Sequence, residues 1–310
     1  MKRIPGGRLL FVATPAAALA FVFSLTQSGS GTTLPSPETG ELCRAQGPSS
    51  SLSVEIRESS GLAKGRSNPA VLWTHNDSGN DAVLFGLDST GTTVARVPLL
   101  GTTTVDWEDL EAGPCEDGNC LYVADIGDNG RQRESVSIYV VPEPAAGSSG
   151  VKPLRHLVAR YPDGAQDAEG LFVLPNGQVH LVTKGRHGEI ALYRYPRAAT
   201  SGVATLERVR TLLPRPKSNL DRVTSATASP NGRWVAIRTY RTLYLYPTKA
   251  LISESKALPL TFDLTPLKER QGESVALTDG GELWLTSEAK GGRDRPTMVR
   301  LQCTLTEGAS

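Results

Sequence analysis

The sequence predicts an all-β fold, a five-bladed β-propeller, and three observations support this prediction. A short motif recurs five times, at intervals of 48, 61, 56 and 48 residues. Each copy opens a series of short apolar segments, and a period of roughly fifty residues with several strands per unit is typical of propeller blades. No stretch of useful length shows helical periodicity. The five copies of the motif are Ser60-Gly61-Leu62, Glu108-Asp109-Leu110, Glu169-Gly170-Leu171, Ser225-Ala226-Thr227 and Glu273-Ser274-Val275.

Four strands are expected in order within each unit. The motif begins the first strand, and in three units an Asn-Gly or Asp-Gly turn ends it, at 174–177, 229–232 and 278–281. These dipeptides accept the positive φ angles of tight hairpins. The second strands are expected at 71–75, 121–125, 179–184, 234–238 and 283–288. The third strands are expected at 83–87, 136–141, 190–195, 242–246 and 297–301. The more polar fourth strands are expected at 93–97, 156–161, 206–210 and 258–262.

The last unit lacks a fourth strand of its own, because the chain ends soon after its third strand. A spare strand at 51–56 precedes the first motif and is expected to complete the last blade. This closes the ring and removes an exposed sheet edge. The propeller is therefore expected to cover residues 51–303, with a C-terminal tail at 304–310.

Residues 1–30 read as a targeting segment. Basic residues precede an apolar run from Leu9 to Leu25, which is typical of a secretory signal peptide. No clear small-x-small cleavage site follows, so an uncleaved N-terminal anchor stays open as the alternative. Residues 31–50 are rich in Ser, Thr, Pro and Gly and are expected to be a linker. We expect a secreted, periplasmic or cell-envelope protein that meets a membrane only through this first segment.

Four cysteines fit an exported protein. Cys115 and Cys120 flank a short polar turn and are expected to staple a hairpin. Cys43 and Cys303 lie near the two ends of the mature chain, and pairing them would tie these ends together. Four free thiols are the alternative, whereas a zinc site is not favoured, since none of the four His has ligand spacing to a Cys.

The charge balance argues against a nucleic-acid partner. The formal net charge is only +1, with 21% charged residues, and no run of like charge is present. We expect a monomer whose partner is a metal ion or a small polar ligand.

Polar residues are expected to converge on one end of the central channel, here called the mouth. In an antiparallel blade, the start of the first strand and the end of the second lie at the same end, and the first strand lines the channel. Acidic residues two positions before the motif join this set as Glu58, Asp106 and Asp167. The expected ligand-binding residues are Ser60, His75, Asn76, Arg238 and Glu288. The expected metal ligands are Asp77, Glu108, Asp125, Asp128, Glu169 and Glu273.

Several carboxylates in a narrow channel repel each other unless a cation, a basic partner or raised pKa values offset the charge. Oxygen ligands suit a hard cation, so Ca²⁺ is the first candidate cofactor and Mg²⁺ the second. The polar loops 75–81 and 125–131 lie where they could contribute. Two alternatives remain: Lys184 and Arg238 could neutralise the acids, or the acids could merely cap turns.

Two further functions stay open. A metal-dependent hydrolase of phosphate esters or glycosides would use paired carboxylates, with Glu108, Glu169, Glu273 and Lys184 as the catalytic candidates. A protein-interaction scaffold in the cell envelope would use the loops of the other face. The sequence does not decide whether the protein is an enzyme.

The motifs resemble those of the SdiA-regulated family and, more loosely, the esterase-like phytase propellers. The resemblance rests on 58–62 with Asn76 and Asp77, on 106–110 with Asp125, on 167–171 with Lys184, and on 272–276 with 283–288. It implies an exported five-bladed propeller over about residues 51–303, with an acidic channel mouth that binds calcium. Blade four departs from the family pattern at 223–227 and at Arg238, and the polar insertion at 125–135 also differs.

Overall fold

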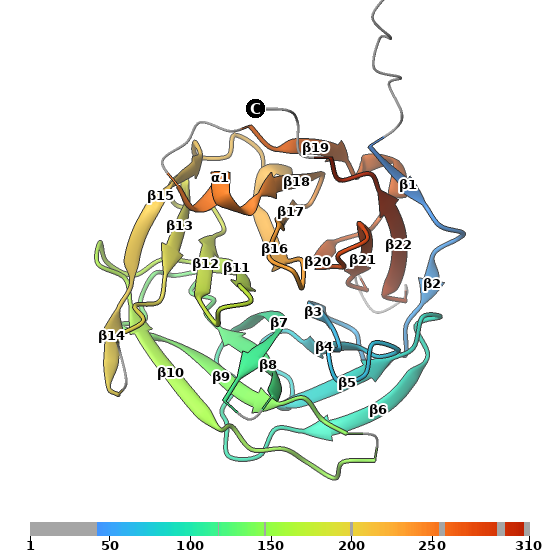
Figure 1. Ribbon diagram of the computed structural model, residues 1–310, viewed down its shortest axis with the longest axis horizontal. Helices are drawn as coiled ribbons and strands as arrows, with labels where there is room; N and C mark the ends of the chain where they lie inside the picture. The colour runs from blue at the N-terminus through green and yellow to red at the C-terminus, as the bar shows by residue number, and fades with distance from the viewer. Residues whose placement is uncertain are drawn as a thin grey trace, which may run out of the picture. The chain divides into compact units, whose positions relative to one another are not determined.

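In the part of the chain that the structure describes, five β-sheets surround a common centre, and each sheet is one blade (Figure 1). This confirms the predicted five-bladed propeller. The structure is a computed structural model that describes residues 42–116, 118–145, 147–198, 201–253, 258–289 and 295–306. The expected signal or anchor at 1–30, the linker up to residue 41 and the tail from 307 to 310 lie outside these residues. No helix among the described residues is both long and apolar enough to cross a membrane.

Blades one and two follow the expected strand order from the centre outward. Blade one consists of β3 (Ser59–Lys64), β4 (Leu72–Asn76), β5 (Val83–Leu87) and β6 (Thr93–Pro98). Blade two consists of β7 (Trp107–Cys115), β8 (Gly118–Asp125), β9 (Val136–Pro142) and β10 (Arg155–Arg160). A fifth strand of blade two, β14 (Val203–Thr205), pairs in parallel with β10 and was not predicted. It comes from blade three and covers the outer edge of blade two, which would otherwise be an unpaired edge.

Blades three and four each have four antiparallel strands. Blade three consists of β11 (Ala168–Val173), β12 (Val179–Thr183), β13 (Ile190–Arg194) and β15 (Glu207–Leu213). Blade four consists of β16 (Val223–Ala228), β17 (Trp234–Thr239), β18 (Thr242–Pro247) and β19 (Leu260–Asp263). The short helix α1 (Thr248–Ile252) follows β18, and single 3-10 turns lie at Asn219–Asp221 and Thr265–Leu267. Gly177 and Gly232 adopt φ angles of 76° and 69° in the expected hairpin turns.

Blade five joins both ends of the propeller. Its strands β20 (Gly272–Leu277), β21 (Glu282–Ser287) and β22 (Thr297–Cys303) pair with the N-terminal strands β1 (Cys43–Ala45) and β2 (Ser50–Ser51). An N-terminal strand therefore closes the ring, as expected. The predicted segment, 51–56, is wrong apart from Ser51, because the strands that pair with β22 are 43–45 and 50–51. Leu52 and Ile56 instead lie outside any strand and are buried in the core beside Met298, whereas Val54, in the turn between them, is exposed.

Both predicted disulfides are present. Cys43 and Cys303 are direct partners in the β1–β22 register and are bonded through their sulfurs. Cys115 and Cys120 close the β7–β8 hairpin. No free cysteine remains among the described residues.

The inner strands β3, β7, β11, β16 and β20 surround the centre (Figure 1). Strand β7 contacts β3, β11 and β16, so it fills part of the channel. At Gly61 of β3 the two backbones are so close that an added Cβ would lie 2.4 Å from the Leu110 nitrogen. Two buried carboxylates of β7, Asp109 and Glu111, accept hydrogen bonds from backbone N–H groups of β16. The channel is therefore packed below the mouth.

Candidate functional site

A β-bulge lies near the start of every inner strand, where the recurring motif stands. In blade two, the residues on either side of Glu108 pair with consecutive residues of β8, so Glu108 has no partner opposite it. The same shift isolates Glu169 in blade three and Glu273 in blade five. A bulge bends the strand and re-aims the side chain of the extra residue. The three glutamates thus occupy equivalent positions at the mouth, as the motif predicted.

Blade four corrects the alignment of the motif by one residue. Its register shift lies between Val223 and Ser225, so the bulged residue is Thr224. Ser225 therefore does not take the position of Glu108. It takes the position of Asp109, and its hydroxyl hydrogen-bonds the Asp109 carboxylate at 3.0 Å.

A second set of mouth residues directly follows the second strands. In four blades, the residue after the second strand, or the next residue, donates its backbone N–H to a carbonyl oxygen. That oxygen belongs to the residue two positions before the bulge. The bonds run from Asp77 N to Glu58 O (2.9 Å), Gly127 N to Asp106 O (3.1 Å), Lys184 N to Asp167 O (2.9 Å) and Glu288 N to Gln271 O (2.8 Å). In blade four the residue after β17 is Tyr240, not the expected Arg238.

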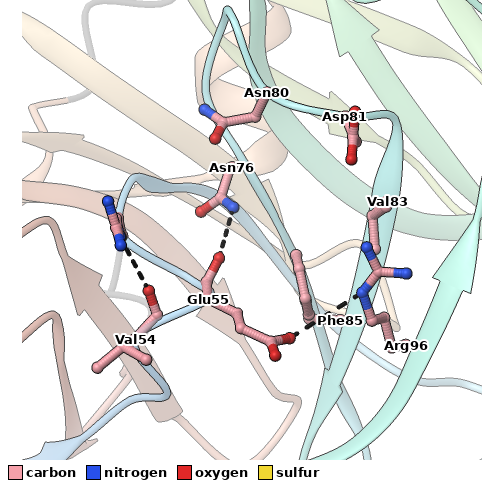
Figure 2. A pocket seen from close by; sticks show the side chains of 9 residues that line it. Val54, Glu55, Asn76, Asn80, Asp81, Val83, Phe85 and Arg96 are labelled. Carbon is pink, nitrogen blue, oxygen red and sulfur yellow. Dashed lines mark hydrogen bonds and ion pairs between the residues drawn. The ribbon is translucent and has the colours of Figure 1, made fainter.

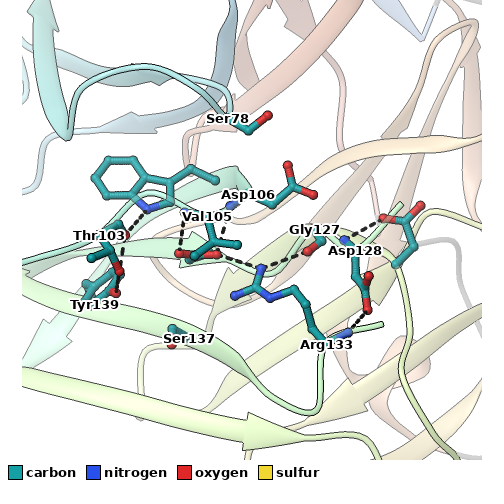
Figure 3. Close-up of polar contacts among 12 residues, drawn as sticks. Ser78, Thr103, Val105, Asp106, Gly127, Asp128, Arg133, Ser137 and Tyr139 are labelled. Carbon is teal, nitrogen blue, oxygen red and sulfur yellow. Dashed lines mark hydrogen bonds and ion pairs between the residues drawn. The ribbon is translucent and has the colours of Figure 1, made fainter. Parts of the chain in front are cut away.

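Asp77, Asp106 and Glu108 form the densest acidic group. One carboxylate oxygen from each lies within 4.8 Å of the other two. Figure 3 shows Asp106 beside Gly127 in the loop after β8. A Cβ at Gly127 would meet Glu108 Oε1 at 2.2 Å and Asp106 Oδ2 at 2.5 Å, so only glycine lets the loop approach both carboxylates. Asp77 and Asp106 are half-buried and Glu108 is buried.

Burial and mutual repulsion disfavour the charged forms of these acids. Burial and the Asp77 carboxylate raise the pKa of Asp106 to about 6. Burial and the carboxylates of Glu169 and Asp77 raise the pKa of Glu108 well above its ordinary value. Burial also raises the pKa of Asp77. Among the described residues, no Lys or Arg side chain hydrogen-bonds to any of the three.

Asp167 adds a fourth carboxylate next to this group. It raises the pKa values of both Asp106 and Glu169, after the larger effect of burial, so it lies near each of them. Its Oδ1 accepts a hydrogen bond from Asp128 N at 3.1 Å. Its Oδ2 is buried and has no hydrogen-bond partner in the part of the chain that the structure describes. Such a buried acceptor normally binds a donor or a cation.

Asp125 and Asp128 support the loop behind the acidic group. Asp125 accepts hydrogen bonds from Val105 N and Asp106 N, at 3.2 and 3.1 Å, and forms an ion pair with Arg133 at 2.7 Å (Figure 3). Asp128 accepts two backbone N–H bonds of its own turn, at 2.8 Å each. Both carboxylates therefore have protein partners, and the structure does not place them in the group of three.

Lys184 occupies the other half of the mouth. Its ammonium forms an ion pair with Glu169 and is only 13% exposed. Although burial acts against it, the carboxylates of Glu169 and Glu108 raise the pKa of Lys184. Burial nevertheless raises the pKa of Glu169 to about 8 despite the lysine. Tyr240 lies nearby, since burial and the carboxylates of Glu273 and Glu169 raise its pKa.

Glu273 and Glu288 share one neutral partner. The amide of Gln271 donates to Glu273 Oε1 at 2.8 Å and to Glu288 Oε2 at 2.6 Å. Burial and the Glu288 carboxylate raise the pKa of Glu273 to about 8. Burial, followed by the Asp77 carboxylate, raises the pKa of Glu288 to about 8. The neutral amide does not offset their charge, so both carboxyl groups favour the protonated form near neutral pH unless a cation lies beside them.

The remaining predicted ligand-binding residues have structural contacts. Ser60 donates its hydroxyl to the Glu108 carbonyl oxygen at 2.7 Å. His75 is fully buried, donates Nδ1–H to the Asn76 carbonyl oxygen, and has a pKa lowered by burial. Asn76 donates its amide N–H to the carbonyl oxygen of Glu55, in the turn before β3, at 2.8 Å. Arg238 is fully buried, where it donates to the Ser274 and Thr286 carbonyl oxygens and pairs with Glu269.

A separate pocket of about 590 Å³ lies on blade one beside the Asp77 loop (Figure 2). Three of its four charged side chains have contacts, since Arg96 lies 4.0 Å from Glu55 and Arg57 Nε donates to the Val54 carbonyl oxygen. None of the residues that line this pocket belongs to the group of Asp77, Asp106 and Glu108. We therefore place the candidate site at the mouth.

Three residues of the mouth were missed in the sequence: Gly127, Tyr240 and Gln271. Gln271 stands two positions before Glu273, as Asp106 stands before Glu108, so the repeat itself carried the signal. The charge of Arg238 favoured that residue over Tyr240 as the mouth residue of blade four. Gly127 carried no signal beyond its place in a polar loop.

No protein-family model matches the chain, and no curated protein matches it. Among solved structures, the chain is similar to the PQQ-bound aldose sugar dehydrogenase of Streptomyces coelicolor, with a TM-score of 0.50 and 13% identity over 84% of this chain and 98% of that one. The calcium structure of the Trichoderma reesei family AA12 carbohydrate-active enzyme gives a TM-score of 0.47 and 10% identity over 86% of this chain and 98% of that one. The likeness to the sugar dehydrogenase supports the β-propeller fold. The resemblance to the SdiA-regulated family stays a prediction.

Proposed function

We propose that this propeller binds one divalent cation, calcium, through Asp77, Asp106 and Glu108. The observation that carries the proposal is the approach of three carboxylates to within 4.8 Å of one another. Two oxygens that each lie about 2.4 Å from one Ca²⁺ are up to about 4.8 Å apart, so the group fits this ion. Mg²⁺ needs shorter bonds and a stricter octahedral geometry, which makes it the second candidate.

The electrostatics of the mouth support a bound cation. Carboxylates that are buried together lose hydration and repel each other, which raises their pKa values. A divalent ion reverses both effects, because it supplies opposite charge at the same oxygens. The unpartnered Asp167 Oδ2 adds a further acceptor beside the group. The glycine at position 127 keeps the space between Asp106 and Glu108 clear of a side chain.

Calorimetric titration of the metal-free protein with CaCl₂ tests this proposal. We expect one binding event per chain and a rise in the unfolding midpoint with calcium concentration, since a ligand that binds only the folded state stabilises it by about 2.7 kcal/mol at one hundred times Kd. Glu108→Gln should lose most of the affinity. Glu116→Gln is the matched control, because Glu116 is exposed on the turn at the other end of the β7–β8 hairpin.

The behaviour in chelator separates lost binding from lost folding. In EDTA, Glu108→Gln should be at least as stable as the wild type, because the substitution removes one of several repelling carboxylates. In millimolar calcium, the wild type should become the more stable protein. An unchanged midpoint of the wild type across millimolar calcium, with no heat of binding, would rule the cation out.

We also propose that the protein is exported. Its two disulfides, Cys43–Cys303 and Cys115–Cys120, fit an oxidising compartment. The basic and apolar pattern of residues 1–30 supports the same view. Cell fractionation and N-terminal sequencing of the mature protein test this, and a cytoplasmic full-length product would contradict it.

A further inference from the structure

Lys184 brings an ammonium group to a place in the mouth where acids of the described residues lie on several sides. It follows β12, forms an ion pair with the buried Glu169, and is itself only 13% exposed. It also acts on the carboxylates of Glu108, Glu273 and Glu288, since its charge opposes the rise in their pKa values. These acids come from the inner strands β7, β11 and β20 and from the loop after β21. The ammonium thus lies among oxygens, as a metal ion would.

Among the residues that the structure describes, the second half of the mouth has more acids than bases. Glu169, Glu273 and Glu288 share one lysine and the neutral amide of Gln271. Arg238, the next nearest base on blade four, is already bound to Glu269 and to two carbonyl oxygens. The acids in this half of the mouth therefore need a cation near them, and the ammonium of Lys184 is that cation.

We infer that the ammonium of Lys184 occupies a second cation position of the mouth, so that this chain binds one divalent ion fewer than its carboxylates can hold. The inference rests on the proposed function, because it takes the group of Asp77, Asp106 and Glu108 as the first position. Lys184 is then the residue that sets the number of ions.

The physical reason is the cost of a buried, unpaired carboxylate. Removing one partner of a buried ion pair leaves an uncompensated charge, which strongly destabilises the folded protein. Glu169 is 98% buried, so it must either take up a proton or bind another cation when Lys184 is replaced by a neutral residue. Carboxylates of neighbouring blades supply the further oxygens that a hard cation needs.

Equilibrium dialysis against CaCl₂, with metal analysis of the retained protein, measures the number of ions per chain. We expect Lys184→Gln to bind one calcium ion more than the wild type. Lys184→Arg keeps the charge and should bind the wild-type number. In the double variant Lys184→Gln with Glu169→Gln, the count should return to that of the wild type, because the main carboxylate of the second position is gone.

Lys64→Gln is the matched control. Lys64 is also half-buried on an inner strand, but it ends β3 at the far end from the mouth and lies 5.5 Å from the Trp284 ring centre. Its replacement should leave the ion count unchanged. If Lys184→Gln binds the same number of ions as the wild type, the inference is wrong, whereas a wild type that binds no calcium contradicts the proposed function instead.

Unfolding measurements keep the test decisive if Lys184→Gln is unstable without metal. Its midpoint should then rise more in millimolar calcium than that of the wild type, because calcium replaces the lost ammonium. A variant that stays unfolded in calcium, while Lys184→Arg folds, would overturn the inference.

Discussion

The carboxylate of Asp109 in blade two accepts a hydrogen bond from the hydroxyl of Ser225 in blade four, 3.0 Å away and 116 residues later in the chain. The same carboxylate accepts the backbone N–H groups of Leu171 at 2.8 Å and Ala226 at 3.0 Å. These N–H groups belong to the inner strands of blades three and four, which have no strand neighbour on the channel side. One side chain therefore replaces a missing strand at the centre of the ring.

The first prediction concerns this bond. Asp109→Ala should lower the free energy of unfolding by about 3 kcal/mol, since several buried donors lose their acceptor at once. Asp88→Ala is the control, because Asp88 accepts similar hydrogen bonds from Thr90 and Thr92 in an exposed turn, and it should cost less than about 1 kcal/mol. Urea unfolding measures both. Equal losses for the two variants would show that Asp109 does not tie the blades together.

The second prediction concerns Glu111, which accepts the backbone N–H of Ala228 at 2.9 Å. Burial raises the pKa of Glu111 from 4.5 to about 7. Between these values the folded protein keeps a proton that the unfolded chain releases, so stability falls as the pH rises from about 4.5 to about 7. The loss amounts to about 3 kcal/mol. Glu111→Gln cannot titrate and should lack this part of the pH dependence.

Urea unfolding in chelator at about pH 5 and about pH 8 measures this effect. The stability of Glu111→Gln relative to the wild type should increase between the two pH values. A constant difference would mean that Glu111 ionises in the folded protein much as it does in the unfolded chain.

The third prediction compares the two disulfides. Cys43–Cys303 spans 260 residues and Cys115–Cys120 spans 5. In the chain-entropy view, the longer loop contributes about 5–6 kcal/mol and the shorter about 2 kcal/mol. Replacing Cys43 and Cys303 by Ala should therefore lower the free energy of unfolding by more than the same change at Cys115 and Cys120. Unfolding without reductant tests the order, and a reversed order would contradict it.

The fourth prediction concerns Gly127 and the proposed cation. Gly127→Ala should weaken calcium binding by about tenfold, or about 1.4 kcal/mol, because the new methyl group would push apart the carboxylates of Asp106 and Glu108. Gly130→Ala lies in the same loop, where an added Cβ meets nothing closer than 3.4 Å, and should bind calcium normally. Calorimetry compares the two. Normal affinity in Gly127→Ala would argue against a cation between these two carboxylates.

Much of the fold follows from the repeat. The interval of the motif gave the number of blades, and the acids at Glu108, Glu169 and Glu273 all lie at bulges of inner strands. Blade four was aligned one residue late, because a bulge adds a single residue and leaves no trace in the hydrophobic alternation.

The grouping of the acids was beyond the sequence. Asp125 and Asp128 have the residue type and position of metal ligands, yet their oxygens accept loop N–H groups. Only the three-dimensional structure shows which carboxylates already accept hydrogen bonds from the protein. The ring-closing strands were misplaced because 43–45 and 50–51 are short and polar, so strand propensity does not mark them, although Cys43 lies opposite Cys303 and is bonded to it.

The closure of blade five also fixes an order of events in the growing chain. Synthesis begins at the N-terminus, so β1 and β2 exist long before their partner β22. Blades one to four can assemble as they appear, whereas the first strands wait until Thr297–Cys303 has been made. Every shorter nascent chain carries an open sheet edge. The first two strands of the propeller are thus the last to find their partner.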